Sequence, residues 1–180
     1  MNVLDKVALW DRNCLLALQK RRKSPLLDKV FIFVAYSGVG KSWLTITSII
    51  WLFQLSHVEI LPRQLDFLKS TVAVLVAWVL SRIIKLAVKR RRPFETAGIF
   101  SLHTKTAYGT SFPSTHTATS AALFFALLAD GHPLSGSVGI WALLIALSRI
   151  HLRVHFLSDV VAGLATALFA VYLNSYWSFR

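Results

Sequence analysis

The sequence is short of cysteine, of charged side chains and, among these, of acids. Its 180 residues include one cysteine, Cys14, so no intramolecular disulfide can form. Charged residues make up 16% and hydrophobic residues 55%, whereas a soluble domain has about 25% charged and about 45–50% apolar residues. A soluble fold of this size could not bury so much apolar surface. The composition therefore indicates one domain that has lipid as its solvent.

Acidic residues are outnumbered, with eight Asp and Glu against 20 Lys and Arg, which gives a formal net charge of +12. Such basicity often indicates nucleic-acid binding. Here the cations cluster at the ends of apolar runs and do not cover a soluble face. Phosphate on a lipid headgroup would satisfy the same charge. We therefore expect a lipid bilayer and a lipid phosphate as partners, and no nucleic acid.

The first 42 residues contain two stretches that imitate known motifs, a secretory signal peptide and a nucleotide-binding loop, and neither motif is complete. A secretory signal is not indicated, because the apolar stretch Val7–Leu18 is broken by Asp11 and Arg12, and the basic cluster 20–23 follows it. Residues 35–42 imitate a Walker A loop, but that loop needs a strand before it and a soluble helix after it. A predicted membrane span follows instead, so we expect no nucleotide.

Five apolar runs are candidates for membrane spans, which need about 20 mainly apolar residues. They are Trp43–Leu55 (short unless residues 39–41 join it), Leu68–Val88, Ser114–Leu128, Val138–Leu152 and Phe156–Trp177. No internal repeat or low-complexity tract interrupts them. The long polar stretch Lys89–Pro113 lies between the second and third of these spans, and irregular segments of that length are usually functional.

The N-terminal segment is less apolar. Val7–Leu18 looks amphipathic and is predicted to lie in the membrane interface, and Pro25 can open another helix. The expected fold is therefore an all-α integral membrane protein, with residues 1–180 in one domain. In this fold residues 1–38 form an interfacial segment and residues 39–180 a transmembrane core of five helices, or six if the helix that begins at Pro25 also crosses.

Side chains suited to catalysis gather in three segments beside the predicted spans, and ionisable residues at such positions mark functional sites. Their members are Lys85 and Arg92, then Ser114 and His116, then Arg149, His155 and Asp159. Counting the spans from Leu68 onward brings all three segments to the same membrane face. This convergence is a stronger signal than any one segment.

The chemistry that these residues offer is phosphoryl transfer. His155 and Asp159 are four residues apart, so on a helix they would share one face. A carboxylate bonded to one imidazole nitrogen fixes the tautomer and leaves the other nitrogen free to attack. Lys85, Arg92 and Arg149 can surround a phosphoryl group and stabilise the charge on its oxygens.

A second group of residues would begin a helix. Ser114 starts it just after Pro113, and its hydroxyl and the free backbone N–H groups there can bind an anion. His116 lies in the same turn and can protonate a leaving oxygen. The flanking cations of the run 89–91 fit a solvated membrane-flanking patch and a functional role equally well.

A metal site is the competing interpretation of the third segment. His151, His155 and Asp159 recur at i, i+4 and i+8, which resembles a metal-binding helix face. Arg149 and Arg153 beside them would repel a cation. We therefore expect no metal and no other cofactor.

The three segments resemble the motifs of the type 2 phosphatidic acid phosphatase superfamily, a family of membrane-embedded lipid phosphatases. The family patterns are K-x6-R-P, P-S-G-H and S-R-x5-H-x3-D. The matching residues are Lys85, Arg92 and Pro93, then Pro113, Ser114 and His116, then Ser148, Arg149, His155 and Asp159. Thr115 replaces the glycine of the second pattern, which places a side chain beside the phosphate site but removes no catalytic atom.

The resemblance implies a helical bundle and a metal-independent phosphohistidine mechanism. His155 would attack phosphorus, Asp159 would orient it, and His116 would protonate the leaving group. The residues that would hold the phosphoryl oxygens are Lys85, Arg92, Ser114 and Arg149. The candidate substrates are a polyprenyl diphosphate, phosphatidylglycerophosphate, phosphatidic acid and a lipid A phosphate. A lipid phosphotransferase remains an alternative, as does, more remotely, a non-enzymatic transporter or scaffold.

The side of the membrane is predicted differently by two arguments. The resemblance implies a bacterial inner (plasma) membrane protein with its active site on the extracytoplasmic face. The positive-inside rule favours the cytoplasm for the same loops, because they carry most of the cations. We expect the extracytoplasmic face, since several of these cations are needed for catalysis whichever way they point. The sequence indicates no particular oligomeric state.

Overall fold

The computed structural model describes residues 3–20, 24–38, 64–96 and 98–178, and the regular elements in these ranges are all helices. They are α1 (Val3–Lys20), α2 (Pro25–Ser37), α4 (Gln64–Val88), the 3-10 helix η1 (Pro93–Glu95), α5 (Thr115–Ala129), α6 (Ser135–His151) and α7 (Leu157–Ser178). The all-α prediction is confirmed for this part of the chain. The predicted span Trp43–Leu55 lies outside the described residues.

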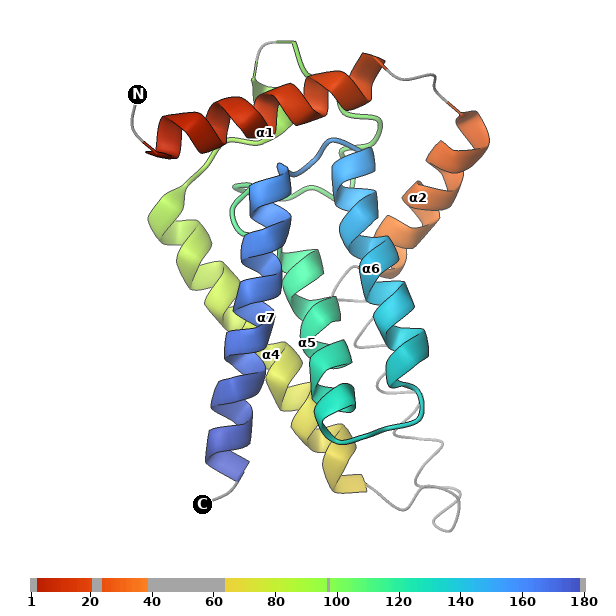
Figure 1. The fold of residues 1–180 in the computed structure, drawn as a ribbon, viewed down its shortest axis with the longest axis vertical. Coiled ribbons are helices and arrows are strands. Elements are labelled where there is room, and N and C mark those ends of the chain that lie inside the picture. Colours follow the sequence, from red (N-terminus) through yellow and green to blue (C-terminus); the bar gives the residue numbers. More distant parts are fainter. Residues whose placement is uncertain (1–2, 21–23, 39–63, 97, 179–180) are drawn as a thin grey trace.

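The helices form a bundle that is closed at one end by α1. In the bundle α5 packs against α4, α6 and α7, α4 also packs against α7, and α2 lies against α6. Figure 1 shows α1 lying across the end at which α7 begins, while the C-terminus lies at the opposite end. The polar stretch between α4 and α5 lies at this same end, where part of it passes behind α1 and the rest lies between α1 and the start of α5 (Figure 1). The bundle therefore has one end made of loops and helix ends, and that end carries the three motif segments.

Small side chains form the core between α4, α5 and α7. The fully buried members of this cluster are Ala77, Ala121, Ala122, Ala167 and Ala170. Residues without long side chains let helix backbones approach closely, as is usual in membrane bundles. At Gly163 of α7 an added Cβ would lie only 2.7 Å from the carbonyl oxygen of Ser114. Glycine at this position therefore allows α7 to pass directly beside the start of α5.

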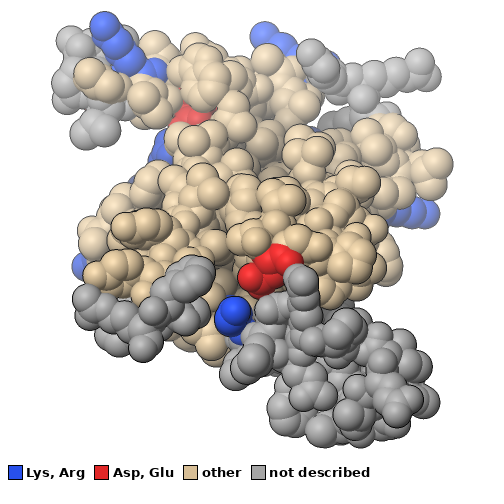
Figure 2. Space-filling view, turned by 60° about the horizontal axis from the view of Figure 1, so that its bottom comes forward, with Lys and Arg blue, Asp and Glu red and all other residues tan. Residues whose placement is uncertain are grey.

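The outer surface of the bundle is largely apolar. Two segments, Lys69–Glu95, which includes most of α4, and Leu157–Tyr176 of α7, are long and apolar enough to cross a membrane. Helices α5 and α6 are apolar but shorter. Figure 2, with the end opposite α1 turned forward, shows few charged side chains on the described part of that face. The described residues thus contain two helices of spanning length, against the five spans predicted for the whole chain.

Candidate active site

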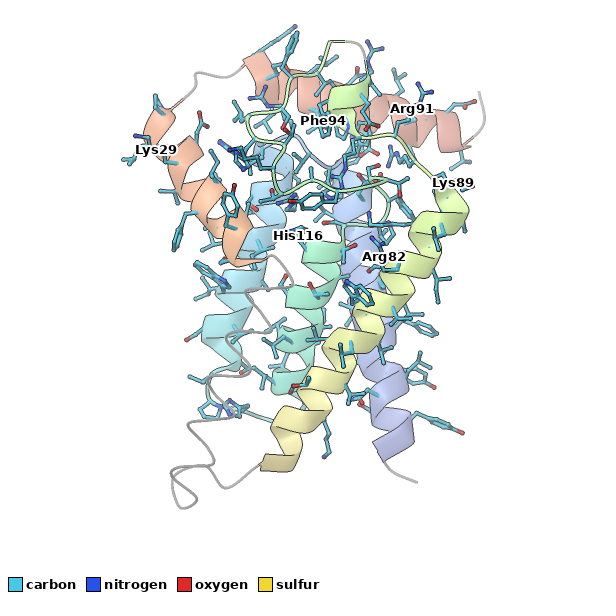
Figure 3. The ribbon with its side chains drawn as sticks, turned by 180° about the vertical axis from the view of Figure 1, so that it is seen from behind. Lys29, Arg82, Lys89, Arg91, Phe94 and His116 are labelled. Carbon is cyan, nitrogen blue, oxygen red and sulfur yellow. The ribbon has the colours of Figure 1, made fainter. Side chains whose placement is uncertain are left out.

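The first motif segment turns into the bundle where α4 ends. Val88 is the last residue of α4, and Lys89 follows it with a left-handed backbone (φ 49°). The amide of Lys89 still donates to the Lys85 carbonyl (3.1 Å). This turn changes the direction of the chain after α4. The side chains of Arg90 and Arg92 therefore reach Asp159 and His155 inside the bundle. Figure 3 shows Lys89 and Arg91 on the outside of this turn.

Lys85 and Arg92 are buried and contact backbone carbonyl groups of the loop before α5. The Lys85 Nζ donates to the carbonyl oxygen of Thr110 (2.6 Å). The Arg92 guanidinium donates to the carbonyl oxygens of Tyr108 (2.7 Å) and Gly109 (2.8 Å). Both cations therefore shape this loop, which lies between α4 and α5.

Arg149, in the last turn of α6, is fully buried and contacts the same loop from the other side. Its two terminal nitrogens donate to the hydroxyl and the carbonyl oxygen of Thr106, each at 3.1 Å. Its Nε is buried without a hydrogen-bond partner. In the described part of the chain, the ion pairs found involve none of the three cations Lys85, Arg92 and Arg149. The site thus holds a concentration of positive charge, which is an environment that attracts an anion.

His155 lies between a carboxylate and a guanidinium. Its Nδ1 is 3.4 Å from Oδ2 of Asp159, and its Nε2 is 3.3 Å from Nη1 of Arg92. Asp159 Oδ2 also accepts from the amide of Phe156 (2.8 Å). The tautomer that suits both neighbours carries its proton on Nδ1, because the carboxylate can only accept and the guanidinium can only donate. The lone pair of Nε2 then faces the cations.

The local backbone differs from the predicted helix face. Helix α6 ends at His151 and α7 begins at Leu157, so His155 lies in the loop between them and only Asp159 is helical. Arg153 has a left-handed backbone (φ 57°), and the Arg149 carbonyl accepts from the amide of His155 (3.3 Å). The expectation that both residues share a helix face is therefore wrong, although their side chains do meet.

The surroundings of His155 favour its neutral form. Burial is the main cause that lowers the pKa of His155 well below its ordinary value, and the positive charges of Arg92, Arg149 and Lys85 lower it further. The imidazole consequently keeps its lone pair at neutral pH. A neutral imidazole beside an orienting carboxylate is the state required of a nucleophile.

The second motif begins α5 as predicted. Ser114 is the N-cap residue of α5 and follows the cis peptide Phe112–Pro113. Its amide donates to the carbonyl oxygen of Asp159 (2.9 Å), which ties the start of α5 to the first turn of α7. The side-chain oxygen of Thr115, the departure from the family pattern, is buried and has no hydrogen-bond partner.

His116 lies in the first turn of α5, deeper in the bundle than the loops above it (Figure 3). Its Nε2 is buried without a hydrogen-bond partner. The residues that interact with it electrostatically are Arg149, His155, Arg92 and Lys85. The structure thus brings together all seven side chains predicted for the site, from four helices and two loops.

His151, the first member of the predicted metal-binding pattern, lies outside the site. His151 points away from His155, and its Nε2 contacts Oδ1 of Asp28 in α2 (2.8 Å). The ring of Phe31 packs on the same imidazole, with centroids 4.5 Å apart. Among the described residues no group of three or more His, Cys, Asp or Glu side chains could hold a metal ion. The i, i+4, i+8 pattern is broken by the end of α6, and His151 serves to attach α2.

Sequence reasoning left Arg90 undecided and missed the role of Asp11. Arg90 donates to Oδ1 of Asp159 and to Oδ2 of Asp11, each at 2.8 Å. Asp11, in α1, is fully buried. The signal was present, because Asp11 interrupts an apolar run and a buried carboxylate needs a partner. The sequence alone did not show which of its many cations that partner is.

Comparison with known proteins finds a matching family model and two similar phosphatases. The sequence model of the PAP2 superfamily matches residues 66–180. A decaprenylphosphoryl-5-phosphoribose phosphatase of Mycobacterium tuberculosis is 35% identical over 112 residues, which cover 62% of this chain and 60% of that protein. A lipid A 1-phosphatase of Rhizobium johnstonii is 31% identical over 151 residues, covering 72% and 59%. The chain therefore spans about three fifths of the length of these curated relatives.

Two crystal structures share the fold. A PAP2-type phosphatidylglycerolphosphate phosphatase from Bacillus subtilis superposes with a TM-score of 0.74 at 22% identity, covering 96% of this chain and 86% of the other. LpxE of Aquifex aeolicus gives a TM-score of 0.73 at 24% identity, covering 90% and 93%. At these identities the likeness shows the fold alone. Because the superposition reaches 96% of the chain, it includes the N-terminal helices, which lie before the matched residues 66–180.

Proposed function

Because this chain belongs to the PAP2 superfamily, we propose that it is a membrane lipid phosphatase with His155 as its nucleophile. The observation that carries the proposal is the position of His155, with Nδ1 at the Asp159 carboxylate and Nε2 at the Arg92 guanidinium. This arrangement activates one nitrogen and directs it into a cluster of cations. An imidazole so placed is suited to attack a phosphorus atom whose oxygens the cations hold.

The first step forms the bond between Nε2 of His155 and phosphorus. The bond from phosphorus to the leaving oxygen breaks in the same step, and His116 gives that oxygen a proton. The unpartnered Nε2 of His116 and Nε of Arg149 support these roles, because both are buried polar groups with hydrogen-bonding capacity left for a ligand. Lys85, Arg92 and the start of α5 at Ser114 would bind the remaining phosphoryl oxygens.

The second step is hydrolysis of the phosphohistidine. A water molecule attacks phosphorus, His116 accepts its proton, and the bond to His155 breaks, which returns a neutral imidazole and releases phosphate. The proposed reaction uses the three cations for charge stabilisation and gives no step to a metal ion. Oriented donors in a buried site supply this stabilisation without reorganisation during the reaction.

The proposed substrate is a phosphomonoester or diphosphate of a membrane lipid. The relatives support this class, because their names specify a decaprenylphosphoryl phosphoribose, lipid A and phosphatidylglycerolphosphate. A polyprenyl diphosphate, phosphatidylglycerophosphate, phosphatidic acid and a lipid A phosphate form the panel to test. The polar stretch 89–113 is too small to form a separate domain for headgroup recognition, which favours a small phosphate group presented at the membrane surface.

The decisive experiment measures phosphate release from these four lipids by the purified chain in detergent, with a chelator present. We expect release from at least one lipid, and a loss of at least about a thousandfold in kcat for His155→Ala. Acid-labile, alkali-stable phosphate on the wild-type chain would identify the phosphohistidine. A requirement for a divalent metal, or full activity of His155→Ala, would overturn the mechanism. Transfer to a lipid acceptor in place of free phosphate would assign a phosphotransferase.

The topology is a separate part of the proposal. We propose that helices α4 to α7 and the apolar run 43–55 cross the inner membrane, with the active site on the extracytoplasmic face. Lys105 is exposed in the loop at the active-site end, and Ser137 is exposed near the opposite end. Lys105→Cys and Ser137→Cys, each in a Cys14→Ser background, would be labelled in intact spheroplasts with an impermeant maleimide. Labelling of position 105 only after permeabilisation would defeat the assignment.

A further inference from the structure

Asp11 is a fully buried carboxylate that reaches the site from outside the three motif segments. It belongs to α1, before the residues 66–180 that the superfamily model matches. Its Oδ1 accepts from the amide of Ser158 (3.0 Å), and its Oδ2 accepts from the Ser158 hydroxyl and from Arg90. A buried carboxylate is unfavourable unless it is paired and hydrogen-bonded. Both partners, Ser158 and Arg90, lie beside Asp159, and so these contacts attach α1 to the start of α7 (Figure 1).

Arg90 connects this carboxylate to the one that contacts His155. Its Nη1 donates to Oδ1 of Asp159 and its Nη2 to Oδ2 of Asp11, each at 2.8 Å. The guanidinium also lies over the ring of Phe156, 4.2 Å from its centroid. A planar guanidinium can contact two carboxylates in fixed directions, whereas a lysine ammonium cannot. The two oxygens of Asp159 are thereby divided, one for Arg90 and one facing Nδ1 of His155.

We propose that Asp11 and Arg90, here called the Asp11–Arg90 pair, are positioning residues that set the orientation and charge of Asp159 and, through it, the reactivity of His155. The inference deepens the proposed function and rests on His155 being the nucleophile. Neither member of the pair needs to touch the substrate. Asp11 fixes the guanidinium and takes up part of its charge, and Arg90 fixes the Asp159 carboxylate.

The charges around His155 make this testable through pH. The titratable or charged groups that face it are Lys85 and Arg92 from α4 and the turn after it, His116 from α5, Arg149 from α6 and Asp159 from α7. The Asp11–Arg90 pair acts on His155 through the last of these. Removing the negative charge of Asp11 leaves the Arg90 charge directed wholly at Asp159, which disfavours protonated His155. Removing the charge of Arg90 does the reverse.

The experiment is a pH profile of kcat/KM for Asp11→Asn and Arg90→Gln with one lipid phosphate in detergent micelles. The acidic limb reports protonation of the free enzyme's nucleophile. We expect this limb to move to lower pH in Asp11→Asn and to higher pH in Arg90→Gln, by roughly half a unit or more in each case. We also expect kcat to fall about ten- to a hundredfold with a smaller change in KM, since the pair orients the nucleophile and does not bind phosphate.

Matched controls separate this effect from loss of fold and from surface charge. Asp5→Asn removes an exposed carboxylate from the same helix, and Arg91→Gln removes the exposed neighbouring cation; both should leave the limb in place. If Asp11→Asn or Arg90→Gln is not monodisperse, the experiment uses Asp11→Ser or Arg90→Met in its place, because these variants remove the same charges. Limbs that stay at the wild-type position, or move in the same direction, overturn the inference. Absence of phosphate release by the wild-type chain, by contrast, overturns the proposed function itself.

Discussion

The N-terminal helices and the part of the chain from α4 onward use charge in opposite ways. In the later part, the buried cations Lys85, Arg92 and Arg149 contact backbone oxygens of the loop before α5 and leave polar groups available. In the N-terminal part, Asp11 of α1 contacts Arg90, and Asp28 of α2 contacts His151. Each of these partners is two residues from a motif arginine in the sequence. In the proposed mechanism the later part supplies the reacting groups, and the N-terminal helices supply carboxylates that contact the segments carrying these groups.

Asp11 and Asp28 differ in burial, and this difference predicts which of the two contributes more to stability and activity. Asp11 is fully buried and bridges to the residue that contacts His155, whereas the side chains of Asp28 and His151 are each 21% exposed. A buried pair is costly to break, because one charge remains without a partner. A partly exposed pair is screened by solvent and contributes little. Mutations can therefore test whether residues from α4 onward carry out the reaction and the N-terminal helices only hold them in place.

The largest effect in the part from α4 onward, after loss of His155 itself, is expected for Arg92→Lys. The Arg92 guanidinium donates to four carbonyl oxygens and lies against Nε2 of His155, and a lysine cannot make this set of contacts. We expect kcat/KM for lipid phosphate to fall by about a hundred- to a thousandfold. Arg82→Lys is the matched control, since Arg82 is exposed on α4 and lies over Trp78. Similar kinetics in both variants would show that the arrangement around His155 is not what matters.

Gly163→Ala is expected to give the next largest effect, through packing. The added Cβ would lie 2.7 Å from the Ser114 carbonyl oxygen, a backbone atom that cannot move aside cheaply. Overpacking of this kind costs about 1–3 kcal/mol, and separating α7 from α5 would displace His116 and Asp159 from each other. We expect a lower unfolding temperature by tryptophan fluorescence and about a tenfold lower kcat. Gly136→Ala, where an added Cβ meets nothing within 4 Å, should do neither.

The same contrast shows how far the sequence predicts this molecule. The apolar runs predicted helices α4 to α7 because hydropathy records the environment of each segment, and the motif spacing predicted which residues meet at the site. The run Val138–Leu152 predicted the end of α6 to within one residue. The left-handed backbone of Arg153 and the non-helical position of His155 were not predicted, because residues 152–156 contain no glycine or proline. The contact between Asp11 and Arg90 joins positions 79 residues apart, which no local pattern records.

A smaller effect is expected in the N-terminal part, for Asp28→Asn. This change weakens the contact with His151 that helps to hold α2 against α6. Because both side chains are partly exposed, we expect a loss of about 0.5–1 kcal/mol of stability and an unchanged kcat. The neighbouring Lys29→Gln, on the exposed side of α2 (Figure 3), serves as the control. A large fall in kcat for Asp28→Asn would mean that α2 also contributes to the chemistry and would break the distinction between the two carboxylates.

The smallest effect is expected at Lys89, the turn that leads from α4 into the site. Its left-handed backbone (φ 49°) is strained for a residue with a Cβ, and glycine adopts it freely. Glycine also gains freedom in the unfolded chain, which offsets part of the benefit, so Lys89→Gly should raise stability by a few tenths to about 1 kcal/mol. Arg91→Gly, two residues on and without a positive φ, should lower stability or leave it unchanged. If both variants lose stability equally, the turn is not the strained junction between helix and active site that its geometry indicates. Unchanged kcat in Lys89→Gly would show that this junction directs the chain inward without taking part in the chemistry.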